Sequence, residues 1–448
     1  MKRTTRILKR IVAWLLTSAI ILSMTSCFDF SFFEEEEEER TNNFPVYIDD
    51  REMMIGGWDA PMNTLEDIQI AKDMGLTHIF LDQYHAKRGT QAYKDALKLY
   101  EQVGLKVIVQ TSNGLDQPEV ILNDDTDYSE FPAVEFINYW DEPHYSTIDR
   151  VAELVQEHLD KYGDEIKFYG NLLPNTSTQR FNGHSFKEYV QKWAEDVIEK
   201  LPEGQRVLSV DIYPLQEKNG QPVMKTSWLA GVETICLQAK KSNAIPHFFL
   251  LSTEHYSYRA INEEDIRFQF YVNMAFGAQA FSYFTYADSV LSDFEHAFVS
   301  RTKTGKVYDT YYMAQTVNNE IKNFDHVYLN YEWQGTLPII GTNNESGKNA
   351  NFDGLTAALT NLEVASRWDS TEDALVGVFK DGYGNDGLIV TNFTDPALSL
   401  DNLVRFEFNN VSKVRIYRGG IPYDYEVVNN RLDVELEPGE GVFIILGH

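Results

Sequence analysis

Two adjacent carboxylates, Asp141 and Glu142, come after a short run of aromatic and aliphatic residues and directly before Pro143. An apolar run of this length that stops at a proline predicts a buried strand ending at a loop. A buried strand gains nothing by ending in two acids unless their charge is used. Side-chain alternation places Asp141 on the face of Tyr139 and Glu142 on the opposite face, so we expect the two acids to point different ways.

Other polar and aromatic side chains stand where further apolar runs end. In the run over 206–212, alternation turns Ser209, Asp211 and Tyr213 to one face, and Glu254 follows the run over 247–252. Acids, amides and aromatic rings are the groups that a sugar-binding site needs. The residues expected to contact such a ligand are Trp58, Asp82, Asp141, Asn171, Asp211, Tyr213 and Tyr286.

The elements that must position these residues repeat along the chain. From about Arg51 to Phe324, eight apolar runs are each followed by a loop and a helix-like segment. The third of these helices is marked only by a weak turn at Pro118–Leu122. The strands are expected at 53–58, 78–84, 106–111, 135–143, 166–172, 206–212, 247–252 and 280–286.

Eight such units over roughly 270 residues predict an α/β fold, the (β/α)8 TIM barrel, whose active sites lie at the carboxyl ends of the strands. A doubly wound open sheet is the competing α/β fold. It would carry a glycine-rich phosphate turn after the first strand, and the sequence has none there.

Two strand ends resemble those of the clan A glycoside hydrolases, which are retaining (β/α)8 enzymes. In that group an acid/base Glu follows the fourth strand, commonly as Asn-Glu-Pro, and a nucleophilic Glu ends the seventh. Here the fourth strand ends in Asp141-Glu142-Pro143 and the seventh in Ser252-Thr253-Glu254. The resemblance covers the barrel and implies Glu142 as acid/base and Glu254 as nucleophile of a double displacement.

The resemblance has one departure, because Asp141 stands where the group has Asn. An ionised Asp141 accepts a hydrogen bond from a sugar hydroxyl but cannot donate one. Its charge would also raise the pKa of Glu142, which suits a general acid.

Other readings of these residues stay open. Glu142 would alternatively pair with a loop arginine or cap a helix, Glu254 would be a solvated loop acid, and the rings would seal the barrel. At the level of function, the alternatives are a non-catalytic glycan-binding surface lipoprotein and a barrel hydrolase acting on a non-sugar bond. His85 and His255 lack metal-ligand spacing, and the sequence has no phosphate-binding loop or serine elbow, so we expect no metal and no cofactor.

The first residues predict export. Residues 1–26 combine a basic start, an apolar stretch and small residues, as a secretory signal does, and the segment before Cys27 resembles a bacterial lipoprotein signal. Lipidation of Cys27 would anchor the chain to the extracellular face of a bacterial cell membrane. An ordinary signal peptide or an uncleaved anchor is the alternative. Residues 27–50 contain six consecutive glutamates and are expected to form an extended acidic tether.

The rest of the chain divides into two expected domains, a catalytic barrel over 51–334 and a small antiparallel β-sandwich over 335–448. In the second, β-like runs alternate with turns such as Asp381-Gly382 and Pro438-Gly439. The formal net charge of -29 excludes nucleic acid as a partner and favours neutral or cationic substrates over polyanions. The expected partners are therefore a carbohydrate and, through Cys27, a membrane.

Overall fold

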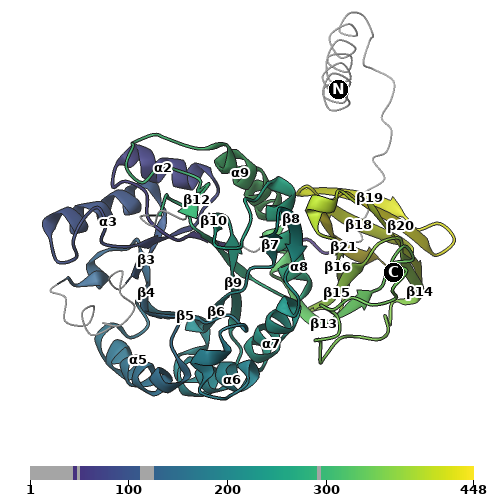
Figure 1. The fold of residues 1–448 in the computed structure, drawn as a ribbon, viewed down its shortest axis with the longest axis horizontal. Coiled ribbons are helices and arrows are strands. Elements are labelled where there is room, and N and C mark those ends of the chain that lie inside the picture. Colours follow the sequence, from purple (N-terminus) through teal and green to yellow (C-terminus); the bar gives the residue numbers. More distant parts are fainter. Residues whose placement is uncertain (1–43, 48–50, 111–125, 290–293, 448) are drawn as a thin grey trace, which may run out of the picture. The chain divides into compact units, whose positions relative to one another are not determined.

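The computed structural model describes residues 44–47, 51–110, 126–289 and 294–447, and a closed barrel of parallel strands forms its centre (Figure 1). Each barrel strand pairs with the next one along the chain, and the last pairs with the first. The eight expected runs all form barrel strands, so the prediction of a TIM barrel is confirmed. The strands are β1 (Met54–Gly57), β2 (His78–Leu81), β3 (Lys106–Gln110), β4 (Val134–Asp141), β5 (Lys167–Leu172), β6 (Val207–Asp211), β9 (Ile245–Leu251) and β11 (Ala280–Phe284).

Helices surround the barrel as an outer ring (Figure 1). The side chain of Thr64 caps the first of them by accepting a hydrogen bond from the backbone N–H of Asp67. The weak turn expected at Pro118–Leu122 lies outside the described residues. The helices are α2 (Leu65–Asp73), α3 (Gln91–Val103), α5 (Ile148–Tyr162), α6 (Phe186–Asp196), α7 (Trp228–Lys241), α8 (Glu263–Ala275) and α9 (Asp309–Lys322).

The barrel interior is filled by aromatic rings and by a chain of polar contacts. The ring of Phe80 lies 4.9 Å from that of Trp58 and 5.5 Å from that of Phe249. The hydroxyl of Tyr169 lies 2.9 Å from His247 Nδ1, and His247 Nε2 lies 2.9 Å from the hydroxyl of Ser282. The barrel is therefore a packed core, and a ligand can enter only at a mouth.

Two antiparallel sheets follow the barrel, and together they enclose one hydrophobic cluster that includes Val376, Val404 and Ile444. This arrangement is consistent with the expected β-sandwich. The larger sheet holds β13 (Tyr331–Ile339), β15 (Ala374–Asp381), β16 (Asp386–Asn392), β21 (Gly441–Gly447), β18 (Lys413–Arg418) and β19 (Ile421–Glu426), and the smaller one holds β14 (Ala365–Ser370), β17 (Asn402–Phe408) and β20 (Arg431–Leu436).

The C-terminal sheets pack directly on the barrel's helices. Gly377 of β15 lies so close to α8 that a side-chain carbon there would come within 2.3 Å of the backbone oxygen of Ala275. Strand β13 crosses the expected boundary at 334/335 and pairs with β15 along its length. Residues 46–448 form one compact unit. Within the described residues, no helix has the length and apolar character to cross a membrane. Cys27 and the signal segment lie outside those residues.

Buried ion pairs also join the two regions. Arg259, in the segment between β9 and α8, contacts Asp265 and Asp395, with the closest N–O distance 2.7 Å in each pair. All three side chains are more than nine-tenths buried. Each carboxylate therefore depends on the guanidinium for its counter-charge.

Replacing Arg259 with Met should lower the free energy of unfolding by about 3–5 kcal/mol, because it leaves two carboxylates buried without a cation. Urea denaturation at neutral pH measures the change. Arg431, which pairs with Asp433 on an exposed stretch of β20, is the matched control, and Arg431→Met should leave the midpoint unchanged. Equal effects of the two substitutions would contradict the assignment of Arg259 as a buried counter-ion.

Candidate active site

A β-bulge at the end of β4 decides where the first acid points. Asn138 is level with Tyr169 on β5, but Trp140 is level with the next residue, Gly170, so one extra residue is inserted on β4. Tyr139 faces the helices, since its hydroxyl lies 2.9 Å from His158 Nδ1 of α5.

Because Trp140 also faces outward at the bulge, Asp141 turns inward and lies level with Asn171. The expectation that Asp141 shares the face of Tyr139 is therefore wrong. The physical reason is the bulge, which breaks the two-residue period on which that expectation rested.

Asn171 joins two carboxylates from different strands. Its Nδ2 donates to Asp141 Oδ1 at 3.2 Å and to Asp211 Oδ1 at 3.4 Å. Ser209 Oγ donates to Asn171 Oδ1 at 2.8 Å and so fixes which way the amide faces. We expected the side-chain amide of Asn171 to contact a ligand, but its nitrogen and oxygen are occupied by these contacts. Asn171 instead holds the two acids in place.

The shared amide nitrogen keeps the carboxylates of Asp141 and Asp211 close. Their Oδ1 atoms can be no farther apart than the two contact lengths taken together. That upper limit lies above the carboxyl separation of retaining glycosidases, about 5–5.5 Å, and just inside the range of inverting ones, about 6.5–9.5 Å, so the contacts are compatible with either arrangement. The sequence predicted that Ser209 and Asp211 share one face of their strand. Their contacts with Asn171 confirm this and show that the face is the inner one.

Burial and mutual repulsion favour the protonated forms of these acids. Burial, together with the charge of Glu142, raises the pKa of Asp141 to about 7. Burial and the charges of Glu142 and Asp141 raise the pKa of Asp211 well above its ordinary value. Burial raises the pKa of Glu142 too, although Arg180, 3.8 Å away, opposes this. All three acids still keep part of their surface open to solvent. A ligand can therefore reach acids whose protonated forms are favoured by their surroundings.

Aromatic side chains and a lysine lie beside the three acids. Tyr213 is 5% exposed, and its ring lies 5.3 Å from that of Tyr258. The charges of Asp211 and Glu142 contribute, after burial, to a raised pKa for both tyrosines. Lys225 Nζ donates to the hydroxyl of Tyr258 at 3.3 Å. The sequence singled out Tyr213. It missed Arg180, Tyr258 and Lys225, because these three residues lie outside the barrel strands, in segments without a periodic apolar pattern.

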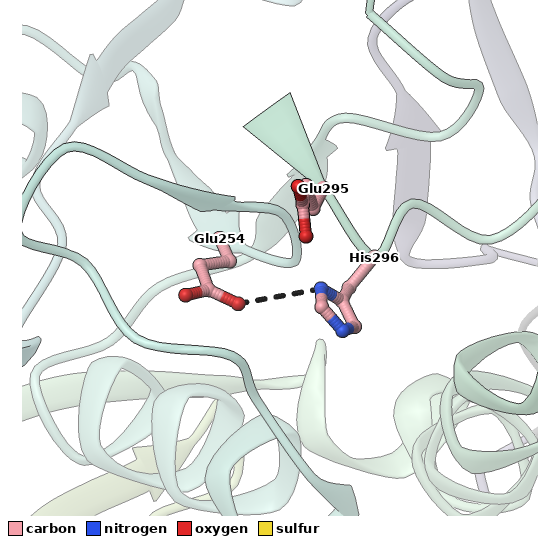
Figure 2. Close-up of side chains that lie close together, drawn as sticks. All are labelled: Glu254, Glu295 and His296. Carbon is pink, nitrogen blue, oxygen red and sulfur yellow. Dashed lines mark ion pairs between the residues drawn. The ribbon is translucent and has the colours of Figure 1, made fainter. Parts of the chain in front are cut away.

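Glu254 occupies a different environment. It lies in the two-residue strand β10 (Glu254–His255), which pairs with β12 (Phe294–Glu295). Its side chain is 45% exposed and forms an ion pair at 3.3 Å with His296 Nδ1 (Figure 2). No direct contact between Glu254 and the three acids occurs within the described residues. Its role as nucleophile stays a prediction.

Glu254, Glu295 and His296 are also the described residues with metal-ligand geometry, since one donor atom from each lies within 4.8 Å of the others (Figure 2). The sequence did not indicate this group because Glu254 lies some forty residues from the other two. All three are partly or fully exposed, and carboxylates grouped on a surface commonly bind no ion.

On the other side of the mouth, Arg301 neutralises two further acids. It lies in the loop after β11, contacts Asp82 directly and reaches Asp59 Oδ1 at 3.2 Å. Asp82, expected to bind a hydroxyl, is 3% exposed and already paired. Trp58 packs on Phe80 and keeps part of its ring accessible.

Tyr286 does not belong to the mouth. It is fully buried, and burial raises its pKa, with further contributions from Tyr311 and Tyr100 on the surrounding helices. Its ring therefore lies between the barrel and its helices and offers no face on which a sugar could stack. Strand alternation could not predict the burial of Tyr286, because Tyr286 lies beyond the end of β11 at Phe284.

Comparison with known proteins gives resemblance in fold only. No protein-family model matches the chain, and no curated protein matches it. A candidate alpha-galactosidase from Bacteroides fragilis is 12% identical, with 89% of this chain and 79% of that chain covered at a TM-score of 0.49. A GH27 β-L-arabinopyranosidase from Geobacillus stearothermophilus, solved with arabinose, is 11% identical over 89% and 98% of the two chains at 0.49. A glycoside hydrolase family 5 protein from Bacteroides vulgatus is 11% identical over 88% of each chain at 0.42. At such identities and scores these likenesses assign no activity.

The raised pKa of Asp141 makes a prediction about stability. A carboxyl whose folded pKa lies near 7, above an unfolded value of about 3.9, makes the fold lose stability as pH rises between those values. Asp141→Asn removes that loss. At pH 8 the free energy of unfolding of the variant should exceed that of wild type by about 1–3 kcal/mol, a figure already reduced for partial solvent screening. The difference should vanish near pH 4.

Urea denaturation at several pH values measures this difference. Asp160→Asn, on the exposed face of α5, controls for the chemical change itself and should give no pH-dependent gain. A gain for Asp141→Asn that is the same at pH 4 and pH 8 would contradict the origin in proton binding.

Proposed function

We propose that this protein is a glycoside hydrolase whose catalytic carboxylates lie at the ends of β4 and β6. The observation that carries the proposal is the Asn171 amide, which holds Asp141 and Asp211 together while burial and repulsion raise the pKa of both. Two acids in such a pair cannot both ionise easily, so near neutral pH one keeps a proton and the other is charged. A protonated acid beside a carboxylate is the combination that cleavage of a glycosidic bond requires.

The roles follow from the two environments. The charges of two neighbouring carboxylates, Glu142 and Asp141, disfavour the ionised form of Asp211, whereas Glu142 alone has this effect on Asp141, so we assign the proton and the role of general acid to Asp211. It protonates the leaving oxygen as the bond between that oxygen and the anomeric carbon breaks. Asp141 attacks the anomeric carbon and forms a glycosyl ester. Water then attacks the same carbon and gives its proton to Asp211, and Asp141 leaves as a carboxylate.

Glu142 has a supporting place in this scheme. Its backbone φ of 56° holds it in the left-handed region, which non-glycine residues rarely adopt, and it pairs loosely with Arg180. Its charge helps to raise the pKa of both aspartates. The sequence resemblance instead makes Glu142 the acid/base and Glu254 the nucleophile. Geometry favours the aspartate pair, because a described hydrogen-bond bridge joins those two acids.

We also propose, from the N-terminal sequence, that acylation of Cys27 holds the protein at a bacterial cell surface. The acidic residues 34–39 then keep the barrel away from the membrane. Extracellular glycans are the substrates that such a location would supply.

The catalytic assignment is tested with a panel of α- and β-linked aryl glycosides. Asp141→Asn and Asp211→Asn should each lower kcat/KM on a cleaved substrate by about a thousandfold or more, since each loses a group required in the transition state. Glu254→Gln, a matched removal of a carboxylate, should stay within about threefold of wild type.

A fluorinated glycoside that traps the glycosyl-enzyme should label Asp141 in wild type. Label on Glu254, with activity lost in Glu254→Gln, would establish the assignment from the sequence instead. If wild type binds glycans but hydrolyses no member of the panel, the protein is a binder and the proposed enzyme function is wrong.

A further inference from the structure

Arg88 is a buried cation with no counter-charge among the described residues. It lies in the segment between β2 and α3 and is 7% exposed. Its Nη1 donates to the backbone oxygen of Gln110 at 3.2 Å, and its backbone N–H donates to Gln83 Oε1 at 3.1 Å. Its Nε and Nη2 have no hydrogen-bond partner. A guanidinium desolvated in this way costs free energy that an anion would recover.

The two unpartnered nitrogens of Arg88 indicate the shape of the missing anion. Nε and Nη2 lie along the same edge of the planar guanidinium and form a side-on fork of two parallel N–H donors. That fork matches the two oxygens of a carboxylate, which it binds through a pair of parallel hydrogen bonds. Lysine cannot form this pair, because its ammonium group is a single point charge.

Two neighbouring amides are unsatisfied as well. Gln110 and Asn138 are level with each other on β3 and β4. Gln110 Nε2, a donor, and Asn138 Oδ1, an acceptor, have no partners, and the side chains are 6% and 1% exposed. Asn138 faces the barrel interior because it is level with Tyr169, and Gln110 therefore faces the interior too. Arg88 contacts the backbone of Gln110, and one spare donor and one spare acceptor on these two strands suit a hydroxylated ligand that carries a carboxylate.

One member of this polar group, Asn138, lies on the same strand as the acid Asp141. Asn138 and Asp141 both face inward from β4, with the bulge between them. Apart from the residue added by the bulge, Asn138 and Asp141 are two strand residues or about 7 Å apart, a span that one sugar with its substituents can bridge.

We propose that Arg88, Gln110 and Asn138 form the part of the sugar site that recognises a carboxylate, and that the sugar cleaved is a uronic acid. This inference rests on the proposed glycoside hydrolase function and names its substrate class. A single carboxylate held by a desolvated arginine is compatible with the acidic surface, which still repels long polyanions. The unpartnered atoms are closed off from solvent in the ligand-free chain, so a ligand's carboxylate reaches them by local opening.

The kinetic test compares matched aryl glycosides that differ only at C6, namely glucuronides with glucosides and galacturonides with galactosides, in both anomers. Wild type should prefer one uronide over its neutral partner. Arg88→Met should lose at least about a hundredfold in kcat/KM on that uronide while its activity on the neutral partner changes less than about threefold. Arg88→Lys should retain only part of the preference, because it keeps the charge but loses the fork.

Arg150→Met, which removes a partly exposed arginine of α5, is the matched control for loss of positive charge and should match wild type on both substrates. A wild-type preference for the neutral partner, or for a 6-sulfated sugar over the uronide, would overturn the inference. So would an equal loss on both substrates in Arg88→Met, which is the result expected if the arginine serves only to stabilise the fold.

A binding test separates this inference from the proposed activity. Calorimetry with free glucuronate, galacturonate and the two neutral sugars needs no turnover and is run on wild type, Arg88→Met and Arg88→Lys. Binding of a uronate that Arg88→Met abolishes supports the carboxylate site even if no glycoside is cleaved. Hydrolysis of neutral glycosides without any uronate binding would leave the enzyme function standing and refute the carboxylate site.

Discussion

Two acids stay close inside a protein only if their repulsion is reduced, and here burial favours their protonated forms while a single amide holds them together. Asn171 donates to Asp141 and to Asp211, and Ser209 fixes its orientation from behind. The hydroxyl of Tyr169 lies 2.6 Å from that of Ser209 and continues the contacts across the barrel to His247. The positions of the acids therefore depend on a polar chain through the core, and a defect anywhere along it would loosen them.

The acids on the two sides of the barrel mouth differ in the cations that they contact. On the side of β1 and β2, Arg301 neutralises Asp59 and Asp82, and its guanidinium lies 4.3 Å from the ring centre of Tyr84. On the side of β4 and β6, Arg180 pairs with Glu142 at 3.8 Å, and among the described residues no cation forms an ion pair with Asp141 or Asp211. Arg301 opposes the effect of burial on Asp59, although burial still raises the pKa of Asp59 to about 7, so raised pKa values occur on both sides. Both sides have acids at strand ends, so composition at those positions cannot distinguish them.

The sequence was sufficient for the barrel because each strand is a short apolar run between breakers, and all eight expected runs form barrel strands. It was insufficient where a feature has no periodic signal. The bulge at Tyr139 adds one residue without altering the apolar pattern, so the direction of Asp141 was predicted wrongly. The sequence did not single out strand β19, all of whose residues are exposed. Arg88 and Arg301 lie in loops, where only the folded chain shows what they face.

The passage of β13 across the junction has a consequence for how such a chain can evolve. The strand begins beside the last helices of the barrel and ends in the C-terminal sheet, and Gly377 and Arg259 fit the two regions together at close range. A gene fusion that joined this barrel to another partner at the same point would break a paired strand and expose buried acids. The C-terminal sheets are thus an inherited part of the barrel's own support rather than a module that recombination can exchange freely.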